Sequence, residues 1–252
     1  MNPWTLVKGF PVVTVQRLST KQIIVKQQKF SLNSEEQNTT KEDSNVWPIY
    51  LTLKSESGNQ TYYLTKAEAT IDLENEIPID SWIKLNTEES GFYIVNYEPE
   101  DWKRLIDLLK NNREELLPTD RANLIFDASM LAESGLLSYE VLFDLISYVE
   151  SEDNLIPWMA VQSCINRLDD KFHSSEGGLA MKQFTRDLTQ DIYSSLRWQF
   201  EGRAVETFQE KWVLFFSLIT EKYFSYFYST FDRLLKTWFS FIFVCILRLI
   251  IM

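Results

Sequence analysis

The residue types that most often perform chemistry in proteins are scarce in this chain. A zinc site built on imidazole needs two or three histidines at fixed spacing, and the 252 residues include only one, His173. A Ser-His-Asp or Cys-His arrangement would have to use that same histidine, which lies beside serines in a polar segment. The seven glycines are scattered and form no phosphate-binding loop. Residue chemistry alone therefore predicts a scaffold without an active site.

The cysteines and the clustered carboxylates also have structural explanations. Cys164 lies in an apolar helical pattern and Cys245 in an apolar C-terminal stretch, so their spacing indicates neither a zinc site nor a redox pair. Two buried thiols are favoured over a disulfide between them. Carboxylates gather in "EPED" (98–101) and "ESED" (150–153). Both groups lie at expected helix ends, where the helix dipole and solvent explain acids without catalysis.

Composition and charge limit the class of protein. The formal net charge of −11 argues against a nucleic-acid surface, because neutralising phosphates requires clustered Lys and Arg. An acidic surface favours solubility, with attraction of basic peptides as the alternative. Hydrophobic residues make up 45% of the chain and aromatic residues 14%, which is typical of a globular protein. The length allows two modest domains, each with its own core.

Residues 1–97 have the pattern of a β domain. "FPVVTVQ" and "KQIIVKQQKFSL" are β-branched runs separated by polar breaks, and hydrophobic side chains alternate with polar ones from Ile49 to Lys54. "SESGNQ" predicts a hairpin turn with Gly58 in its tight position, and "TEES" predicts a second hairpin between "WIKLN" and "GFYIVNY". Six or seven short strands at this spacing suggest a small antiparallel β-sandwich. The polar stretch 33–45 is expected to be a surface loop.

From Glu98 the hydrophobic period changes from two to 3.6, which predicts helices. The first begins at "EPEDW", and the second begins near Pro118, where Thr119 or Asp120 is expected to cap the first turn. Gly135 is expected to end the second helix in a left-handed conformation. Ser138 and Asn154 are expected to begin the third and fourth helices. A fifth helix is expected after "SSEGG", with a hydrophobic stripe of Met181, Phe184, Leu188 and Ile192.

Short connections between these helices imply antiparallel neighbours stacked as an array of HEAT-like pairs. The predicted fold class is therefore α+β: a small antiparallel β-sandwich over 1–97, then an α-helical array over 98–198 that is incomplete at its C-terminal end. No helix follows that would cover the stripe of the fifth helix, so we expect this stripe to be exposed. We therefore also expect self-association and poor solubility of the isolated chain.

Three segments, in order, resemble the zinc aminopeptidases of the aminopeptidase N type, which include endoplasmic-reticulum and insect gut enzymes. They are "MNPWTLVKGFPVVTV", "WIKLNTEESGFYIVNYEPEDW" and "LLPTDRANLIFDASMLAESG". The likeness continues through "NLIPWMAVQSCINRL" and fades after about Trp198. In that family an N-terminal β domain and a thermolysin-like catalytic domain precede a small β-sandwich and a large helical closing domain. The resemblance implies that 1–97 is the sandwich and that 98–198 contains the first helices of the closing domain.

The resemblance does not include the catalytic motifs of that family. The HExxH zinc helix and the Gly-x-Met-Glu-Asn motif that binds the substrate amine do not occur in this sequence, so no catalytic or metal-binding role is carried over. Zinc and peptide substrates are implied for the intact family enzyme, and this chain is expected to be inactive alone. For Asp120 and Arg121 the resemblance suggests contact with a peptide in the cavity. A helix cap and a salt bridge between helices are the favoured alternative.

Residues 199–252 form a hydrophobic tail that departs from the family pattern and suggests a truncated or mis-spliced product. The uncharged run from Thr237 to Leu247 has eleven residues, whereas a spanning helix needs about twenty. Membrane-surface association and an exposed apolar segment remain the two alternatives for this tail. Cutting the chain after about Glu210 is expected to improve its solubility.

The sequence and the family resemblance suggest two alternative functions and a set of possible compartments. The first function is a non-catalytic fragment of a zinc aminopeptidase that shapes the peptide cavity and supports domain closure. The alternative is a stand-alone peptide-binding or partner-binding module associated with a membrane. The resemblance implies the cell exterior, the plasma membrane or the endoplasmic-reticulum lumen. Asn38 and Asn59 lie in Asn-x-Thr sequons and are candidates for glycosylation, which we expect only behind an upstream signal sequence because "MNPWTLVKGF" lacks the pattern of one.

Overall fold

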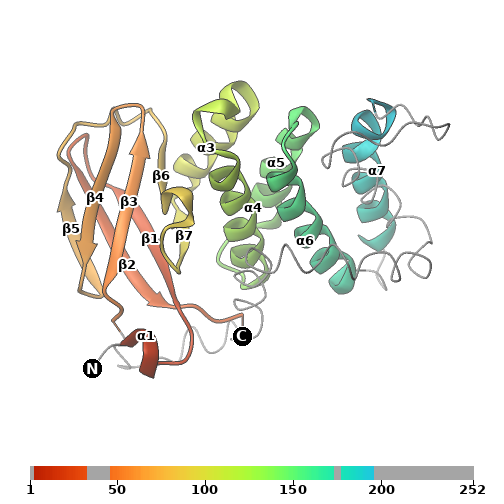
Figure 1. Ribbon diagram of the computed structural model, residues 1–252. Coiled ribbons are helices and arrows are strands. Elements are labelled where there is room, and N and C mark those ends of the chain that lie inside the picture. Colours follow the sequence, from red (N-terminus) through yellow and green to blue (C-terminus); the bar gives the residue numbers. More distant parts are fainter. Residues whose placement is uncertain (1–2, 33–45, 173–176, 196–252) are drawn as a thin grey trace, which may run out of the picture.

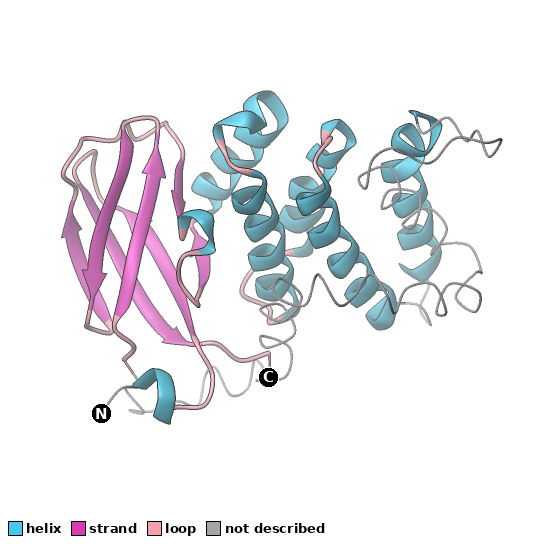
Figure 2. Ribbon diagram, in the orientation of Figure 1, coloured by secondary structure: helices cyan, strands magenta, loops and turns pink. Residues whose placement is uncertain are grey.

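The computed structural model describes residues 3–32, 46–172 and 177–195, with side chains described as far as Thr189. After the short helix α1 (Pro3–Leu6), strands occupy most of the first part of these residues and helices the second (Figures 1 and 2). The predicted α+β class is therefore confirmed. His173, Asn38, Cys245 and the tail at 199–252 lie outside the described residues.

The larger sheet has four strands in the order β5-β2-β1-β7. Strand β1 (Pro11–Arg17) pairs antiparallel with β2 (Gln22–Lys29), and β2 pairs antiparallel with β5 (Glu68–Asp72). Strand β7 (Ile94–Tyr97), however, runs parallel to β1. The expectation of a purely antiparallel sandwich is wrong at this strand. A parallel neighbour requires a long crossover, and here the chain passes through the second sheet between β1 and β7.

The smaller sheet has three strands in the order β4-β3-β6. Strands β3 (Ile49–Ser55) and β4 (Gly58–Leu64) form the predicted hairpin, in which Ser55 pairs with Gly58 across a two-residue loop. Gly58 has a φ of 107°, a conformation that residues with a Cβ rarely adopt. Buried and more exposed residues alternate along β3, as the period-two pattern predicts.

The second predicted hairpin, around "TEES", is wrong. Strand β6 (Ile83–Leu85) pairs with β3 in the smaller sheet, whereas β7 belongs to the larger sheet. Between them the short helix η1 (Thr87–Glu89) lies in a turn where Asn86, Glu88 and Glu89 all have positive φ. The Asn86 side chain bridges this turn, because its amide donates to the carbonyls of Gly91 and Tyr93 at 3.1 Å each. The segment therefore moves the chain from one sheet to the other.

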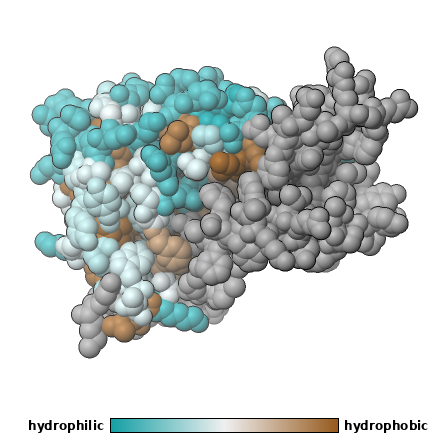
Figure 3. All heavy atoms as spheres, viewed as in Figure 1, coloured by the Kyte–Doolittle hydropathy of each residue, from teal (hydrophilic) through white to brown (hydrophobic). Residues whose placement is uncertain are grey.

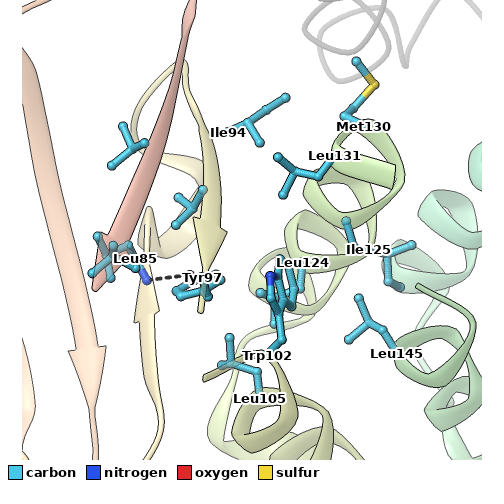
Figure 4. Close-up of a cluster of buried hydrophobic side chains, with 14 of the residues drawn as sticks. Leu85, Ile94, Tyr97, Trp102, Leu105, Leu124, Ile125, Met130, Leu131 and Leu145 are labelled. Atoms are coloured by element: carbon cyan, nitrogen blue, oxygen red, sulfur yellow. Dashed lines mark hydrogen bonds between the residues drawn. The ribbon is translucent and has the colours of Figure 1, made fainter. Parts of the chain in front are cut away.

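One hydrophobic core joins both sheets and the helices. Figure 4 shows its centre, where Trp102 and Leu105 of α3 (Pro99–Asn112) lie beside Tyr97 and below Leu124. The rings of Tyr97 and Trp102 meet edge to face with centroids 5.1 Å apart, a favourable aromatic geometry. The hydroxyl oxygen of Tyr97 accepts the Leu85 backbone N–H at 3.0 Å, which links β6 and β7 across the two sheets.

Helix α4 (Pro118–Glu133) begins at its proline, but the predicted side-chain cap is absent. Its N-cap residue is Leu117, and neither Thr119 nor Asp120 caps the first turn. Proline at the first helical position fixes φ and lacks the N–H that a cap would satisfy, so the helix begins two or three residues earlier than a Thr119 or Asp120 cap requires. At the other end Gly135 has a φ of 80°, and Leu136 N–H donates to the Leu131 carbonyl at 2.9 Å, as a left-handed cap predicts.

The predicted starts of the third and fourth helices are confirmed. Ser138 Oγ accepts Val141 N–H at 3.4 Å before α5 (Tyr139–Ile146), which leads into η3 (Ser147–Ser151). Asn154 Oδ1 accepts Ile156 N–H at 3.0 Å at the start of α6 (Leu155–Phe172). The helices stack away from the sheets, and α7 (Gly177–Ser195) is the farthest (Figure 1).

The expectation of an uncovered stripe on the last of these helices is wrong for its described side chains. Met181 and Leu188 are 6% and 2% exposed, and the Phe184 ring meets Phe143 edge to face at 5.1 Å. The stripe packs on the preceding helices, because each helix of a stack uses its hydrophobic face toward the one before it. The exposed residues of α7 include the polar Lys182, Gln183, Arg186 and Asp187, and also Leu179, which is 76% exposed. The side chain of Ile192 lies outside the described residues.

The described surface carries its hydrophobic residues as separate patches. In the space-filling view the upper part is mostly hydrophilic, with hydrophobic patches between polar ones (Figure 3). Exposed large hydrophobic side chains occur on different elements, and single exposed hydrophobic residues of this kind are common on protein surfaces. Within 3–32, 46–172 and 177–195, no helix has both the length and the apolar character needed to cross a membrane.

Candidate functional site

The most unusual feature of the described residues is a group of polar side chains in the interior. We call it the buried polar cluster; each member is 0% or 1% exposed. It lies where β6, the η1 turn and β7 meet one face of α4. Its members are Lys84, Asn86, Asp120, Asn123 and Asp127.

Lys84 is the only cation of this cluster and is completely buried. Its ammonium donates to the carbonyls of Leu85 and Asn86 at 2.5 and 3.3 Å and to Asn123 Oδ1 at 2.8 Å. Its distance to Asp120 Oδ1 is 3.9 Å. Burial lowers the pKa of Lys84, while the nearby carboxylates, Asp120 foremost, act in the opposite direction. The arrangement therefore holds a desolvated lysine by hydrogen bonds on three sides.

The acidic members of the cluster bind backbone groups of the sheet region. Asp120 Oδ1 accepts the N–H of Glu88 at 2.7 Å, which holds the η1 turn in its left-handed conformation. Asp127 Oδ2 accepts the N–H of Val95 at 3.0 Å and so covers the open edge of β7. Asn123 lies between them and donates to Asp127 Oδ1 at 3.4 Å. Helix α4 therefore supplies, at Val95, a hydrogen bond that a further strand would otherwise make.

Arg121 lies next to Asp120 but is directed toward the following helices. Its Nε and Nη2 bind the two oxygens of Glu152 at 2.8 and 2.9 Å, a bidentate pair with both side chains 3% exposed or less. It also donates to the Leu116 carbonyl at 2.7 Å. Glu152 Oε1 in turn accepts the N–H of Asn154 at 2.9 Å, at the start of α6. Arg121 thus forms a salt bridge between elements of the helical part.

A third buried ion pair connects the first strand to the first helix of the helical part. Arg17 Nε lies 3.0 Å from Asp101 Oδ1, and Arg104 donates to the same oxygen at 2.9 Å. The Arg17 guanidinium also donates to the Pro78 carbonyl at 2.8 Å. The expectation that the helix dipole and solvent explain the acidic groups 98–101 and 150–153 is therefore wrong for Asp101 and Glu152, which are only 2% and 3% exposed.

A cleft of about 530 Å³ opens on the surface beside the β3–β4 turn and α3. Four carboxylates line it together with one guanidinium, that of Arg104, and neither His nor Cys belongs to its lining. Asp120 and Arg121 do not line this cleft, so their contact with a peptide cavity stays a prediction. The lining residues are Glu56, Asp80, Ser81, Trp82, Arg104, Asp107, Leu108, Asn111, Asn112 and Glu115.

Zinc, which the family resemblance implies, has no matching set of ligands here. Among the described residues no group of three or more His, Cys, Asp and Glu side chains is placed to hold a metal ion. The acidic members of the buried polar cluster already bind backbone N–H groups. The described residues therefore do not fit a zinc centre, and no chemical step is assigned to them through zinc.

Two further candidate residues differ in exposure: Cys164 is buried and Asn59 is exposed. Cys164 is a free thiol on α6 that is 1% exposed, and burial raises its pKa to about 11. It is therefore an unreactive protonated thiol at neutral pH. Asn59 is exposed on β4, not in the turn itself.

Sequence reasoning missed most of the buried polar cluster. Only Asp120 was singled out, and for a different role. The available signal was the spacing of Asp120, Asn123 and Asp127, which puts three polar residues on one face of a helix. The other faces of that helix carry the hydrophobic residues Leu124, Ile125, Ala128 and Leu131, which indicates that it is buried on more than one side. The position of Lys84 in a strand gives no such signal.

Comparison with known proteins assigns the chain to a family. Residues 82–238 match the family described as "ERAP1-like C-terminal domain". The chain is 29% identical over 223 residues to glutamyl aminopeptidase of Bitis rhinoceros, covering 86% of this chain and 23% of that protein. It is 32% identical over 205 residues to aminopeptidase N of Plutella xylostella, covering 78% and 21%.

A third relative is endoplasmic reticulum aminopeptidase 1 of Homo sapiens, 32% identical over 209 residues that cover 82% of this chain and 22% of that protein. The chain thus spans about a fifth of the length of these curated relatives. The family match begins at Trp82 and includes every residue of the buried polar cluster. The chain belongs to the ERAP1-like C-terminal domain family, the C-terminal domain of M1 aminopeptidases.

Proposed function

We propose that this chain is a non-catalytic part of a zinc aminopeptidase, in which it holds the helices that close over the peptide cavity. The buried polar cluster carries this proposal. It ties α4 to the crossing between the two sheets through Lys84, Asp120 and Asp127. A helical cover must keep a fixed position on its neighbour in order to shape a cavity, and hydrogen bonds to backbone groups fix that position.

The packing of the helices supports a continuing array. Helix α3 contacts α5 and α4 contacts α6, and these contacts between alternate helices support the proposal of an array of HEAT-like pairs. We infer that further helices follow in the same manner in an intact enzyme. The zinc site and the site for the peptide amine would then lie in parts of the enzyme that this chain does not include.

The names of the relatives suggest a compartment. One of them is called an ectoenzyme and another an endoplasmic reticulum aminopeptidase. We therefore propose that this chain acts in the endoplasmic-reticulum lumen or outside the cell.

The first test is activity of the purified chain. Incubated with aminoacyl reporter substrates and zinc, it should show no hydrolysis that a chelator removes, and it should retain no stoichiometric zinc. Chelator-sensitive hydrolysis would overturn the non-catalytic assignment. Saturable binding of peptides by the chain alone would instead favour the stand-alone binding module.

A chimera tests the role in cavity closure. Residues 1–195 would replace the matching segment of human endoplasmic reticulum aminopeptidase 1, which supplies the rest of the enzyme. We expect zinc-dependent hydrolysis of peptides, with a KM that differs from that of the parent enzyme because the cavity wall has changed. A chimera that folds and retains zinc but hydrolyses neither peptides nor reporters would contradict the proposal.

A further inference from the structure

Strand β4 has a regular division between its two faces. Gln60 and Leu64 are 2% and 1% exposed and point into the core, whereas Asn59, Thr61 and Tyr63 are exposed. Alternate residues of a strand share a face, so these three lie in a row on the outer face of the smaller sheet. The order β4-β3-β6 places this row at the edge of the sheet.

Asn59 and Thr61 are the first and third residues of an Asn-x-Thr sequon. The middle residue, Gln60, is anchored inside, where its Oε1 accepts the Asn75 N–H at 3.1 Å and the Tyr62 hydroxyl at 2.6 Å. The asparagine amide therefore points to solvent while the backbone around it is held. A sugar on that amide would extend from the protein without displacing any core residue.

We propose that Asn59 is a site of N-linked glycosylation. In the reaction, Asn59 Nδ2 loses a proton and forms a bond to C1 of the first sugar of a polyprenyl diphosphate-linked oligosaccharide. The bond between C1 and the diphosphate breaks, and the polyprenyl diphosphate leaves. Transfer takes place on the unfolded chain in the endoplasmic reticulum, and the outward direction of Asn59 then lets the modified chain fold.

The same face carries an exposed aromatic pair that the glycan would reach. Tyr50 and Tyr63 are cross-strand partners, 52% and 66% exposed, with ring centroids 6.4 Å apart. Tyr63 lies four residues from Asn59 on the same strand, about 13 Å away at the usual rise per residue.

The glycosylation proposal rests on the proposed compartment but not on the role in cavity closure. An inactive chimera would therefore not contradict it.

The full chain is expressed in eukaryotic cells behind a cleavable secretion signal, and the chains from which the signal has been cleaved are isolated. Glycosidase treatment in ¹⁸O water followed by peptide mass spectrometry identifies each modified asparagine. We expect the ¹⁸O label on Asn59.

Matched variants separate the sequon from the fold. Asn59→Gln and Thr61→Val should each lose one glycan, whereas Thr61→Ser, which keeps the hydroxyl of the sequon, should retain it. Asn38→Gln serves as the control for the second sequon and should leave the label on Asn59 unchanged. Thermal unfolding of the unglycosylated Asn59→Gln chain should match that of the unglycosylated parent. Signal-cleaved chains without label on Asn59 would overturn the proposal, whether or not Asn38 is modified.

Discussion

At the scale of single residues, the interior of this protein depends on a few charges without access to water. Removing a charge from water is costly, and a buried ion pair repays that cost only when hydrogen bonds satisfy the remaining donors and acceptors. Lys84 meets this condition with three hydrogen bonds and with Asp120 at 3.9 Å. The benefit is a defined position of α4 on the sheets, because the hydrogen bonds from Lys84 to Asn123 and from Glu88 to Asp120 form only when α4 lies beside β6 and the η1 turn.

Replacing Lys84 with Met should lower the free energy of unfolding by about 3–5 kcal/mol, because the buried Asp120 and Asp127 would lose their cation. Denaturant unfolding at neutral pH measures this change. Lys110→Met is the matched control, because Lys110 pairs with Asp144 at the surface and its removal should cost about 1 kcal/mol or less. Equal effects of the two substitutions would show that the buried polar cluster does not stabilise the fold.

The lowered pKa of Lys84 also predicts a dependence of stability on pH. Since the folded pKa lies below 10.5, the unfolded chain binds more protons between those two values, and the free energy of unfolding rises with pH across that window. The Lys84→Met variant lacks this contribution. The free energy of unfolding of the parent minus that of the variant should therefore increase as the pH approaches 10.5. A flat or falling difference would contradict the desolvation of Lys84.

At the scale of elements, the connections that position the helices are made by residues far apart in the chain. The η1 turn depends on Asp120, which follows Glu88 by 32 residues, and α6 depends on Arg121, which precedes Glu152 by 31. One short stretch of α4 therefore holds the sheet crossing on one side and the next helices on the other. These contacts on both sides explain why α4 is buried on nearly all faces.

A double-mutant cycle on Arg121 and Glu152 tests the second of these connections. Arg121→Met and Glu152→Gln should each cost about 3–5 kcal/mol, since each leaves a buried polar group without its partner. The double variant should cost clearly less than the sum, which measures their coupling. The same cycle on Lys26 and Glu68, an exposed pair at 3.6 Å, should show no measurable coupling. Additive effects at Arg121 and Glu152 would contradict a direct interaction.

At the scale of the whole molecule, the strands and helices share one core. The boundary at 97/98 marks a change from strand to helix, but Tyr97 and Trp102 pack together across it. The buried polar cluster also has members on both sides, with Lys84 before the boundary and Asp120 after it. Because the family match begins at Trp82, it too includes β6 and β7 with the helices.

Separating the chain at this boundary should therefore prevent folding. Residues 1–97 and 98–198, expressed alone, should each lack a cooperative thermal transition, because each would expose half of the shared core and unpaired buried charges. Residues 1–195 should unfold in one step, with coincident transitions by circular dichroism and tryptophan fluorescence. A cooperative transition of 1–97 alone would instead show two independent domains.

The sequence by itself determined the features whose cause is local. Gly58 and Gly135 mark turns because only glycine adopts their backbone angles easily. Ser138 and Asn154 begin helices because their side chains accept an N–H only two or three residues ahead. The α+β class follows from the change of hydrophobic period near Glu98, and the family follows from the quoted segments.

Only the tertiary structure decided which distant residues meet. The residues around "TEES" resemble a hairpin, yet β7 pairs with β1 because the η1 turn is held by Asp120 from a later helix. Asp101 and Glu152 resemble solvated helix ends, since a carboxylate at such a position is satisfied equally well by water or by a buried arginine. Apart from Arg104, which contacts Asp101 from the same helix, their partners are Arg17 and Arg121, 84 and 31 residues away in the chain. The local sequence does not show whether water or a distant arginine satisfies such a carboxylate, because the fold brings the distant arginine to it.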